Sequence, residues 1–589
     1  MKLKLTRFLK EVENILDTMS SQQLMAFIHD MARTLPENQR NSFLNKLEKI
    51  GVKEEGYKAE KREENKKIQE QLNRLKENLT KIEEGVLCLE GSLNEMYDEW
   101  YNDDKDEFLF EDPEGVTDII VEACAFLHKC IDMEEYEAGY EIGNILADLS
   151  IEVDGEYMDY MGEPLFIEDL ELFHLCSIDH KKLVVETMYA AYRANELSKR
   201  SEILYEILKR SERNDVTMEM IMQCSEELPE FDEFLERWIQ YLGKQSSVNV
   251  ERLLKEALEF VNNENKLLEF ARENYVQHPG FYEQYISNNV HYVDKKSHLL
   301  EIGKEALEKI EKKYLVRSRI ALLTSQVALD LGMQKEAENG WLEAFRSDTR
   351  VVNYLRLFVE CVHFSDYMNE VKQIRQNIQL KNNRFPYTAI EELKENQISD
   401  NEFYMLAFLG GEFSYAKEQG MNVKDSLGWS VTFMKCGLAA FLLLLLENEN
   451  LQQGCKEMCR KIVSEVKFDK NEYENGLIKE IDDNSQEWFW NCLCRWKNTI
   501  ILSEEEKNMY MQWIEKLVEK RVKGIMEANR RNYYGECAAF IAALGEVRES
   551  RGEGNGKQNL LLEYKTLYSR RRAFHQELRT YGMIEKKRK

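Results

Sequence analysis

Apolar side chains recur along most of this chain at the spacing of an α-helix. Between residues 24 and 35 they fall on one helical stripe, and the same pattern returns at 203–208 and 253–261. No convincing run of alternating apolar and polar residues separates these segments, and only six prolines interrupt the 589 residues. The pattern therefore predicts an all-α protein. We expect helix to exceed about 65% of the residues, against a globular average near one third.

A long succession of helices joined by short polar turns is typical of a solenoid built from helix pairs. One stretch is tetratricopeptide-like, because small and aromatic residues flank a turn near residue 349. The residues that carry this likeness are Ala337, Gly340, Trp341, Ala344, Phe345, Tyr354, Leu355 and Phe358. A similar mixture occurs at 136–140. No fixed period of about 34 residues is found, so we predict a degenerate helix-pair solenoid, with an irregular helical domain as the alternative.

Residues 52–85 differ from the rest because they are mostly charged and carry only a thin apolar stripe. The members of the stripe are Ile68, Leu72, Leu75, Leu79 and Ile82, and their heptad-like spacing lasts for only two heptads. We interpret this segment as a long solvated helix that connects an N-terminal helical domain, 1–51, to a helical-repeat body, 86–500. Residues 501–589 complete the chain as a basic C-terminal helical module.

The most apolar run, 436–446, has 11 residues and is flanked by Lys435 and Glu447. A membrane span needs about 20 apolar residues, so we expect a helix that is buried on all sides and no membrane contact. The first residues are charged throughout and lack the apolar stretch of a signal peptide. Twelve cysteines are too dilute for a disulfide framework. We therefore expect reduced thiols in a cytoplasmic protein.

Charge is distributed very unevenly along the chain, which has 108 acidic and 80 basic residues and a net charge of −28. Residues 94–173 hold 26 acidic and two basic residues, whereas residues 521–589 hold 16 basic and 8 acidic ones. Such asymmetry favours association with partners of opposite charge, or of the two regions with each other. The alternatives are a solvated acidic face and basic residues that pair within the chain. The partner-binding candidates are Asp103, Asp104, Asp106, Arg570, Arg571 and Arg572.

Two short clusters contain residue types that bind zinc. They are Cys124, His128 and Cys130, and His174, Cys176 and His180. Cys124 and His128 are four residues apart, so they share one face of a helix. A zinc site needs four converging ligands, and a buried cysteine often serves only as a small apolar residue. We therefore expect no stoichiometric zinc and no other cofactor.

Catalytic motifs are missing from the chain. It contains neither G-x-S-x-G nor H-E-x-x-H. The glycine-rich loop 551–558 lacks the spacing of a phosphate-binding loop. Asn102, Asp104 and Asp106 have the first spacings of a calcium loop, but Glu107 and Pro113 stand where that loop needs Gly and Glu. The sequence predicts that the protein is not an enzyme.

Residues 521–579 combine a basic helix, an alanine-rich helix, a glycine-rich turn and a second basic helix. The residues concerned are Tyr533, Tyr534, Ala538, Ala539, Ala542, Ala543, Leu544, Gly545, Tyr564, Tyr568, the Arg570–Phe574 run, Glu577 and Leu578. This pattern resembles the helical region at the carboxyl end of bacterial SWIM zinc-finger proteins. The finger itself is absent, because Cys492-x-Cys494 is not followed by a C-x-H pair. The resemblance implies the helical scaffold and not the zinc-dependent role.

These observations favour a non-catalytic helical-repeat scaffold or adaptor that binds other proteins through its surfaces. The alternative is a nucleic-acid-associated accessory protein that uses the basic C-terminal module to contact phosphates. Nucleic acid is the less favoured partner, since a chain with a net charge of −28 repels a polyanion.

Overall fold

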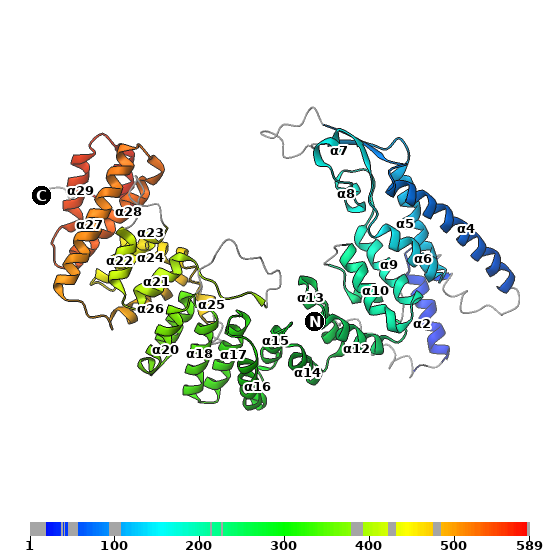
Figure 1. The fold of residues 1–589 in the computed structure, drawn as a ribbon, viewed down its shortest axis with the longest axis horizontal. Coiled ribbons are helices and arrows are strands. Elements are labelled where there is room, and N and C mark those ends of the chain that lie inside the picture. Colours follow the sequence, from blue (N-terminus) through cyan, green and yellow to red (C-terminus); the bar gives the residue numbers. More distant parts are fainter. Residues whose placement is uncertain are drawn as a thin grey trace. The chain divides into compact units, whose positions relative to one another are not determined.

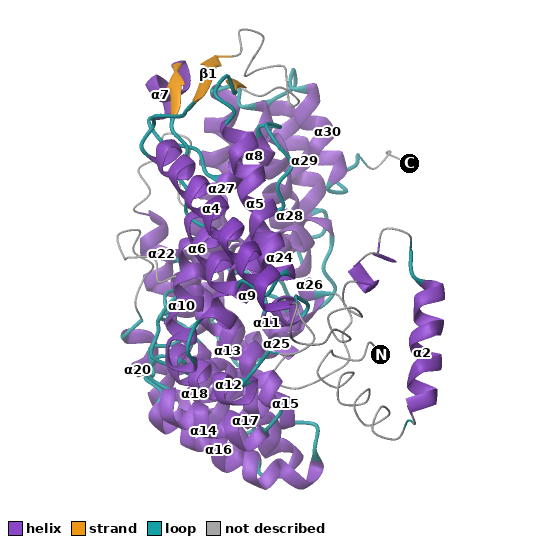
Figure 2. Cartoon of the chain, turned by 90° about the vertical axis from the view of Figure 1, so that its right-hand side faces the viewer, coloured by secondary structure: helices purple, strands orange, loops and turns teal. Residues whose placement is uncertain are grey.

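The structure of the protein is a computed structural model. It describes residues 19, 21–36, 39–40, 42–44, 57–93, 108–211, 215–224, 228–378, 393–421, 432–474 and 484–585. About 72% of these residues are helical, which confirms the all-α prediction. The strands in the described part form one small sheet of β1 (Leu89–Leu93), β2 (Phe108–Glu111) and β3 (Val153–Gly155), drawn in orange in Figure 2. The strand order is β2-β1-β3, with β1 antiparallel to β2 and parallel to β3.

The chain divides into two compact units, Met1–Asn263 and Glu264–Lys589. The division falls inside the range 86–500, which the sequence analysis assigned to a single repeat body. The local reason is visible in the backbone, because one helix ends at Asn262 in the left-handed conformation and the next begins at Glu264. A corrected description therefore has two units, each with its own core.

The first unit contains most of the helices shown from blue to green in Figure 1. They are α2 (Ser21–Thr34), α4 (Tyr57–Glu83), α5 (Val116–Asp132), α6 (Tyr136–Leu146), α7 (Glu156–Met161), α8 (Ile167–Leu172), α9 (His180–Ala194), α10 (Leu197–Arg210), α11 (Met218–Met222), α12 (Phe231–Leu242) and α13 (Val248–Val261). Helix α9 packs against α5, α6 and α10, and α12 packs against both α10 and α13. The small sheet contacts α7.

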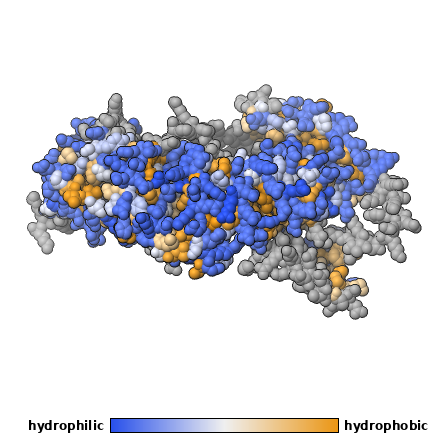
Figure 3. Space-filling view, turned by 60° about the horizontal axis from the view of Figure 1, so that its bottom comes forward, coloured by the Kyte–Doolittle hydropathy of each residue, from blue (hydrophilic) through white to orange (hydrophobic). Residues whose placement is uncertain are grey.

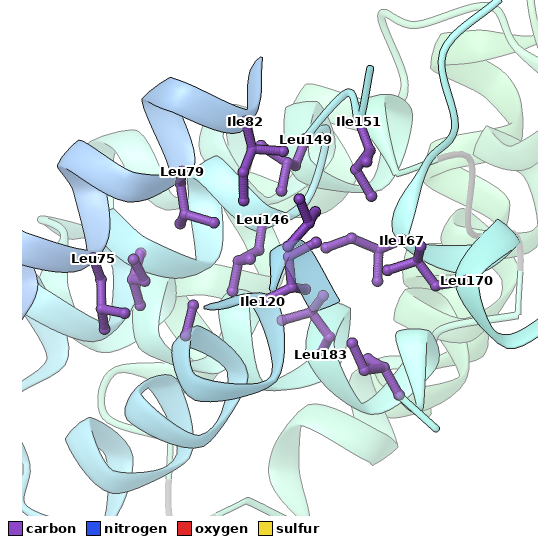
Figure 4. Packing of buried hydrophobic residues seen from close by; sticks show 14 of the residues in the cluster. Leu75, Leu79, Ile82, Ile120, Leu146, Leu149, Ile151, Ile167, Leu170 and Leu183 are labelled. Carbon is purple, nitrogen blue, oxygen red and sulfur yellow. The ribbon is translucent and has the colours of Figure 1, made fainter. Parts of the chain in front are cut away.

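Helix α4 is an integral part of the first core and not a solvated connection. Its apolar stripe is almost completely buried, with Leu75, Leu79 and Ile82 each 0% exposed. Figure 4 shows these side chains pointing toward Ile120 of α5 and Leu146 of α6. The prediction of a solvated helix was wrong because a stripe of two heptads is enough to cover one face of an α5–α6 pair. The charged residues between 66 and 83 lie on the remaining faces of the helix, where they are half-buried or exposed.

The second unit contains the helices that follow, from green to red in Figure 1. They are α14 (Glu264–Asn274), α15 (Gly280–Asn289), α16 (Lys296–Lys309), α17 (Val316–Asp330), α18 (Gln334–Ser347), α19 (Val351–Glu360), α20 (Phe364–Gln376), α21 (Asp400–Leu409), α22 (Phe413–Met421), α23 (Thr432–Leu445), α24 (Gln453–Glu465), α25 (Lys470–Glu474), α26 (Ser485–Lys497), α27 (Glu504–Glu527), α28 (Tyr534–Ser550), α29 (Gly556–Leu567) and α30 (Arg572–Thr580). Short 3-10 turns, Val293–Lys295 and Arg531–Tyr533, precede α16 and α28.

Neighbouring helices in the first part of this unit pack in chain order, α16 with α17, α17 with α18, and α18 with α19. The tetratricopeptide-like residues lie on α18 and α19, where the rings of Phe345 and Tyr354 meet edge to face at 5.7 Å. Later helices combine across longer distances in the sequence, because α24 packs against α28 and α23 packs against α27. The solenoid arrangement therefore stays a prediction.

Helix α23 carries the most apolar run of the chain. Its residues from Leu438 onward are buried, and Leu446 just beyond the helix is only 2% exposed. This confirms the prediction of a helix that is buried on all sides, for the part of the run whose side chains are described. None of the helices in the described residues combines the length and the apolar character that a membrane span needs.

The C-terminal residues 501–589 are joined to the rest of the second unit through close contact between α24 and α28. A Cβ added to Gly454 would lie 2.7 Å from the carbonyl carbon of Ala542, so only glycine fits this crossing. Ala538, Ala539, Ala542 and Ala543 are all fully buried. The basic module is therefore not a separate domain, because its alanine-rich helix completes the core that α23 and α24 begin.

Truncation of a stripe residue tests the role of α4. We expect Leu79→Ala to lower the free energy of unfolding by about 2–5 kcal/mol, because it leaves a cavity in a fully buried site. Leu172→Ala is the matched control, since Leu172 is 65% exposed and the same substitution there leaves stability nearly unchanged. Chemical denaturation of the full chain, followed by circular dichroism, measures both. Equal effects of the two substitutions would restore the solvated-helix interpretation.

A glycine substitution tests the α24–α28 contact. Gly454→Ala places a methyl group against the backbone of α28, and we expect overpacking to destabilise the second unit by about 1–3 kcal/mol. Gly554→Ala is the control, because nothing lies within 4 Å of the added Cβ there. Thermal unfolding of the two variants should separate them. A Gly454→Ala protein as stable as the control would show that the helices can move apart at no cost.

Candidate interaction surfaces

The first cysteine-histidine cluster lies on α5, where Cys124 and His128 face the same neighbour. The imidazole Nδ1 of His128 is 2.8 Å from the Oε1 atom of Glu186 on α9, and its Nε2 is 3.9 Å from a carboxylate oxygen of Asp132. Cys130 belongs instead to the hydrophobic core and is 0% exposed. The predicted shared face therefore exists for Cys124 and His128, but the third residue of the cluster points elsewhere.

The second cluster spans the turn between α8 and α9. His180 begins α9, and its Nδ1 lies 3.1 Å from Glu168 on α8. His174 takes a left-handed backbone conformation, with φ of 58°, in the turn after α8. Cys176 lies near Cys124, since charge on one thiol affects the other. Within the described residues, no group of three or more histidine, cysteine or acidic side chains is placed to hold a metal ion.

Burial keeps the thiols of Cys124, Cys130 and Cys176 protonated. Removal from water raises the pKa of Cys124 to about 12, with smaller contributions from the charges of Cys176 and Glu186. Burial likewise raises the pKa of Cys130 to about 12 and that of Cys176 above its usual value. Metal binding and nucleophilic attack both require the thiolate. The neutral thiol is therefore the stable form at physiological pH.

The small sheet of the first unit places like charges side by side on its exposed face. Glu90 on β1 is directly opposite Glu111 on β2 and directly opposite Asp154 on β3. All three side chains are exposed, and none has a cationic partner among the described residues. We call Glu111, Glu90 and Asp154 the acidic row. Like charges at directly opposite positions destabilise a sheet by about 0.2–1 kcal/mol for each pair, so this arrangement is costly in the isolated protein.

Other carboxylates, within the acid-rich residues 94–173, have structural partners. Asp112 accepts hydrogen bonds from the backbone N–H groups of Val116 and Thr117 at 2.8 and 2.9 Å, and so caps α5. Arg74 and Lys76 of α4 pair with Glu122 and Glu141 of α5 and α6. The exposed carboxylates of residues 94–173 that lack a cationic partner in the described structure, besides the acidic row, are Glu114, Asp118, Glu134, Glu137, Glu156, Glu163 and Glu171. Of these, Glu114 and Glu156 accept hydrogen bonds from the backbone N–H groups of Cys88 and Leu93. The sequence candidates Asp103, Asp104 and Asp106 lie outside the described residues.

Many basic residues of the C-terminal module are engaged within the second unit. Arg521 pairs with Glu536 at 2.9 Å, Arg548 with Glu515 at 2.7 Å, and Lys557 with the buried Glu546 at 2.9 Å. Arg551 and Lys565 also form ion pairs, with Glu504 and Glu585. The intramolecular alternative for the basic charge is therefore correct for these residues.

The three sequence candidates Arg570, Arg571 and Arg572 have different roles in the structure. Arg571 is half-buried, and its guanidinium donates to the carbonyl of Met526 at 3.0 Å and to the side chain of Asn529. The hydrogen bonds of Arg571 thus link the start of α30 to the end of α27. Arg570 and Arg572 are exposed and have no hydrogen-bond or ion-pair partner within the described structure.

The contact made by Arg571 places the turn that contains a second pair of arginines next to the turn that contains residues 570–572. Arg530 and Arg531 follow Asn529 directly, and both are exposed and unpaired in the described structure. The sequence analysis missed these two residues as candidates. The only signal in the sequence was two adjacent arginines, and their closeness to residues 570–572 depends on the tertiary contact.

Comparisons of the chain with protein families, with curated proteins and with solved structures find no match. The resemblance to the C-terminal region of SWIM zinc-finger proteins therefore stays an interpretation of the sequence.

Thiol reactivity tests the account of the cysteine clusters. With a pKa near 12, the thiolate fraction of Cys124 near pH 8 is about three orders of magnitude below that of an ordinary thiol, so we expect very slow alkylation that accelerates with rising pH. Iodoacetamide labelling with peptide mass mapping measures the rate, and the same cysteine in guanidinium is the control. Rapid labelling of Cys124 in the folded protein would show a stabilised thiolate and reopen the metal and nucleophile interpretations.

Proposed function

We propose that the protein is a non-catalytic scaffold or adaptor, in which the acidic row of the first unit docks a basic segment of a partner protein. The observation that carries this proposal is the cross-strand register of Glu111, Glu90 and Asp154. A lysine- or arginine-rich segment laid across the row would neutralise the carboxylates that repel one another in the free protein. A cytoplasmic location and helical-repeat architecture belong to the same proposal.

The chemistry of the described residues supports binding over catalysis. Burial raises the pKa of the clustered cysteine thiols, and the imidazoles of His128 and His180 lie against the carboxylates of Glu186 and Glu168. Hydrophilic residues dominate the face drawn in Figure 3, and its hydrophobic residues form smaller, scattered patches. Recognition by charge suits such a face better than recognition through one large apolar surface.

The alternative function is that of a nucleic-acid-associated accessory protein. Its support is the group of unpaired arginines in the C-terminal module, since guanidinium groups bind phosphates in a bidentate manner. The net charge of −28 opposes nucleic-acid binding only weakly at long range. Salt screens exposed charges that lie more than about 8–10 Å from the phosphates.

Neutralising the acidic row should stabilise the protein and weaken binding. We expect Glu90→Gln with Glu111→Gln to raise the free energy of unfolding by several tenths of a kcal/mol, with a smaller gain at high salt. The same variant should bind a lysine-rich peptide about fivefold more weakly, since the exposed ion pairs that it removes together contribute about 1 kcal/mol. Denaturation at two salt concentrations and fluorescence anisotropy measure the two effects.

The matched control is Glu137→Gln with Glu163→Gln, which removes the same charge from exposed positions outside the row. Affinity purification from the native host should recover a protein partner with the control variant and lose it with the row variant. Equal behaviour of the two variants in both assays would contradict the proposal, because only net charge would then matter.

A further inference from the structure

We propose that the unpaired arginines at one corner of the C-terminal module form a binding site for an acidic protein segment. We call these residues, Arg530, Arg531, Arg570 and Arg572, the arginine corner. The proposal rests on the adaptor function above and adds a second site, of opposite charge, for a different class of partner.

The tertiary structure assembles the corner from two turns that are distant in the sequence. The first turn connects α27 to α28, and the second connects α29 to α30, helices labelled in Figures 1 and 2. Arg571 holds the two turns together through the carbonyl of Met526 and the side chain of Asn529. The rings of Tyr534 and Phe574 meet at 5.7 Å and add an apolar contact between the starts of α28 and α30. These contacts therefore hold the backbones of the two turns next to each other.

The four residues of the arginine corner take no part in the ion pairs within the module. Five other basic residues of the module, at 521, 548, 551, 557 and 565, pair with carboxylates of the second unit. Each residue of the arginine corner is exposed and has no such partner among the described residues. Like charges that are gathered without counterions repel one another, and an anionic ligand relieves that repulsion.

The surroundings of the corner favour a short acidic protein segment over nucleic acid. Exposed carboxylates lie nearby, because Glu527 is three residues before Arg530. Burial and, to a smaller extent, the charges of Glu527 and Glu519 raise the pKa of Tyr568 in the second turn. A nucleic acid carries phosphates along its whole length, so it would bring charge against these residues on leaving the corner. A peptide can place aspartate or glutamate side chains only where the guanidinium groups lie, and each guanidinium matches a carboxylate with two parallel hydrogen bonds.

The test titrates a labelled glutamate-rich peptide into the full chain and follows fluorescence anisotropy. Substitution of all four residues of the arginine corner by Ala should weaken binding about tenfold or more and flatten its dependence on salt. The control replaces Lys312, Lys335, Lys372 and Lys456 by Ala. These lysines are exposed, unpaired in the described structure and outside the module, so the change in net charge is the same.

Retained binding by the control and loss by the corner variant would support the site. Equal losses in the two variants would overturn it, since binding would then follow net charge. A single-stranded oligonucleotide of equal charge that binds more tightly than the peptide, and loses affinity in the corner variant, would also overturn it in favour of nucleic acid. Neither result involves the acidic row, so failure here is distinguishable from failure of the proposed function.

Two further variants keep the test decisive if the fourfold alanine protein folds poorly. Replacing the same four arginines by Lys preserves the charge but removes the bidentate geometry, and we expect an intermediate loss of affinity. Arg571→Ala should lower the thermal stability of the second unit, because it breaks the hydrogen bonds between the two turns. Unchanged peptide affinity in the lysine variant would show that no specific carboxylate contact is made.

Discussion

Close approach between helices is the constraint on which both units depend. It recurs as a glycine on one helix that faces a hydroxyl side chain on the next. Gly143 of α6 meets Thr187 of α9, and Gly303 of α16 meets Thr324 of α17, whose Cβ atoms lie 3.0 Å from where each glycine would place its own. The threonine hydroxyls donate to carbonyls of their own helices at 2.8 and 2.7 Å, so the buried oxygen costs little. Small residues thus allow the backbones to approach, and the two threonine hydroxyls keep a hydrogen-bond partner.

Charged side chains are arranged in two different ways in this chain. Where a carboxylate and a cation meet on neighbouring elements, as in Arg521 with Glu536, the pair joins helices of one unit. The acidic row and the arginine corner break that pattern, because their charged side chains form no ion pairs in the described structure. Features of this kind persist in a fold at the expense of stability, and they are common where a protein meets a partner. Both sites fit the adaptor function that we propose.

The cysteine and histidine clusters show why ligand spacing in a sequence is weak evidence for a metal. Cys124 and His128 do share a helix face, as their separation of four residues predicted, but the imidazole is already engaged by Glu186. Cys130 is turned into the core by the same helical rotation. Desolvation then keeps the thiols protonated, which makes the thiolate harder to form. Chemistry at such positions is decided by what surrounds each side chain.

The sequence by itself determined the helical class, the fully buried α23 and the small residues of α28, because hydrophobic period and residue size are local properties. It also located the regions of excess charge. Only the tertiary structure decided that the charged helix α4 completes a core and that the chain divides near Asn263. It alone placed Glu90 opposite two other carboxylates and brought the turn that contains Arg530 next to the turn that contains Arg570. Strand register and the contact of distant turns both arise from packing between elements. A contact between residues that are far apart in the chain produces no periodic pattern in the sequence. Such patterns indicate only which residues share a face of one helix or strand.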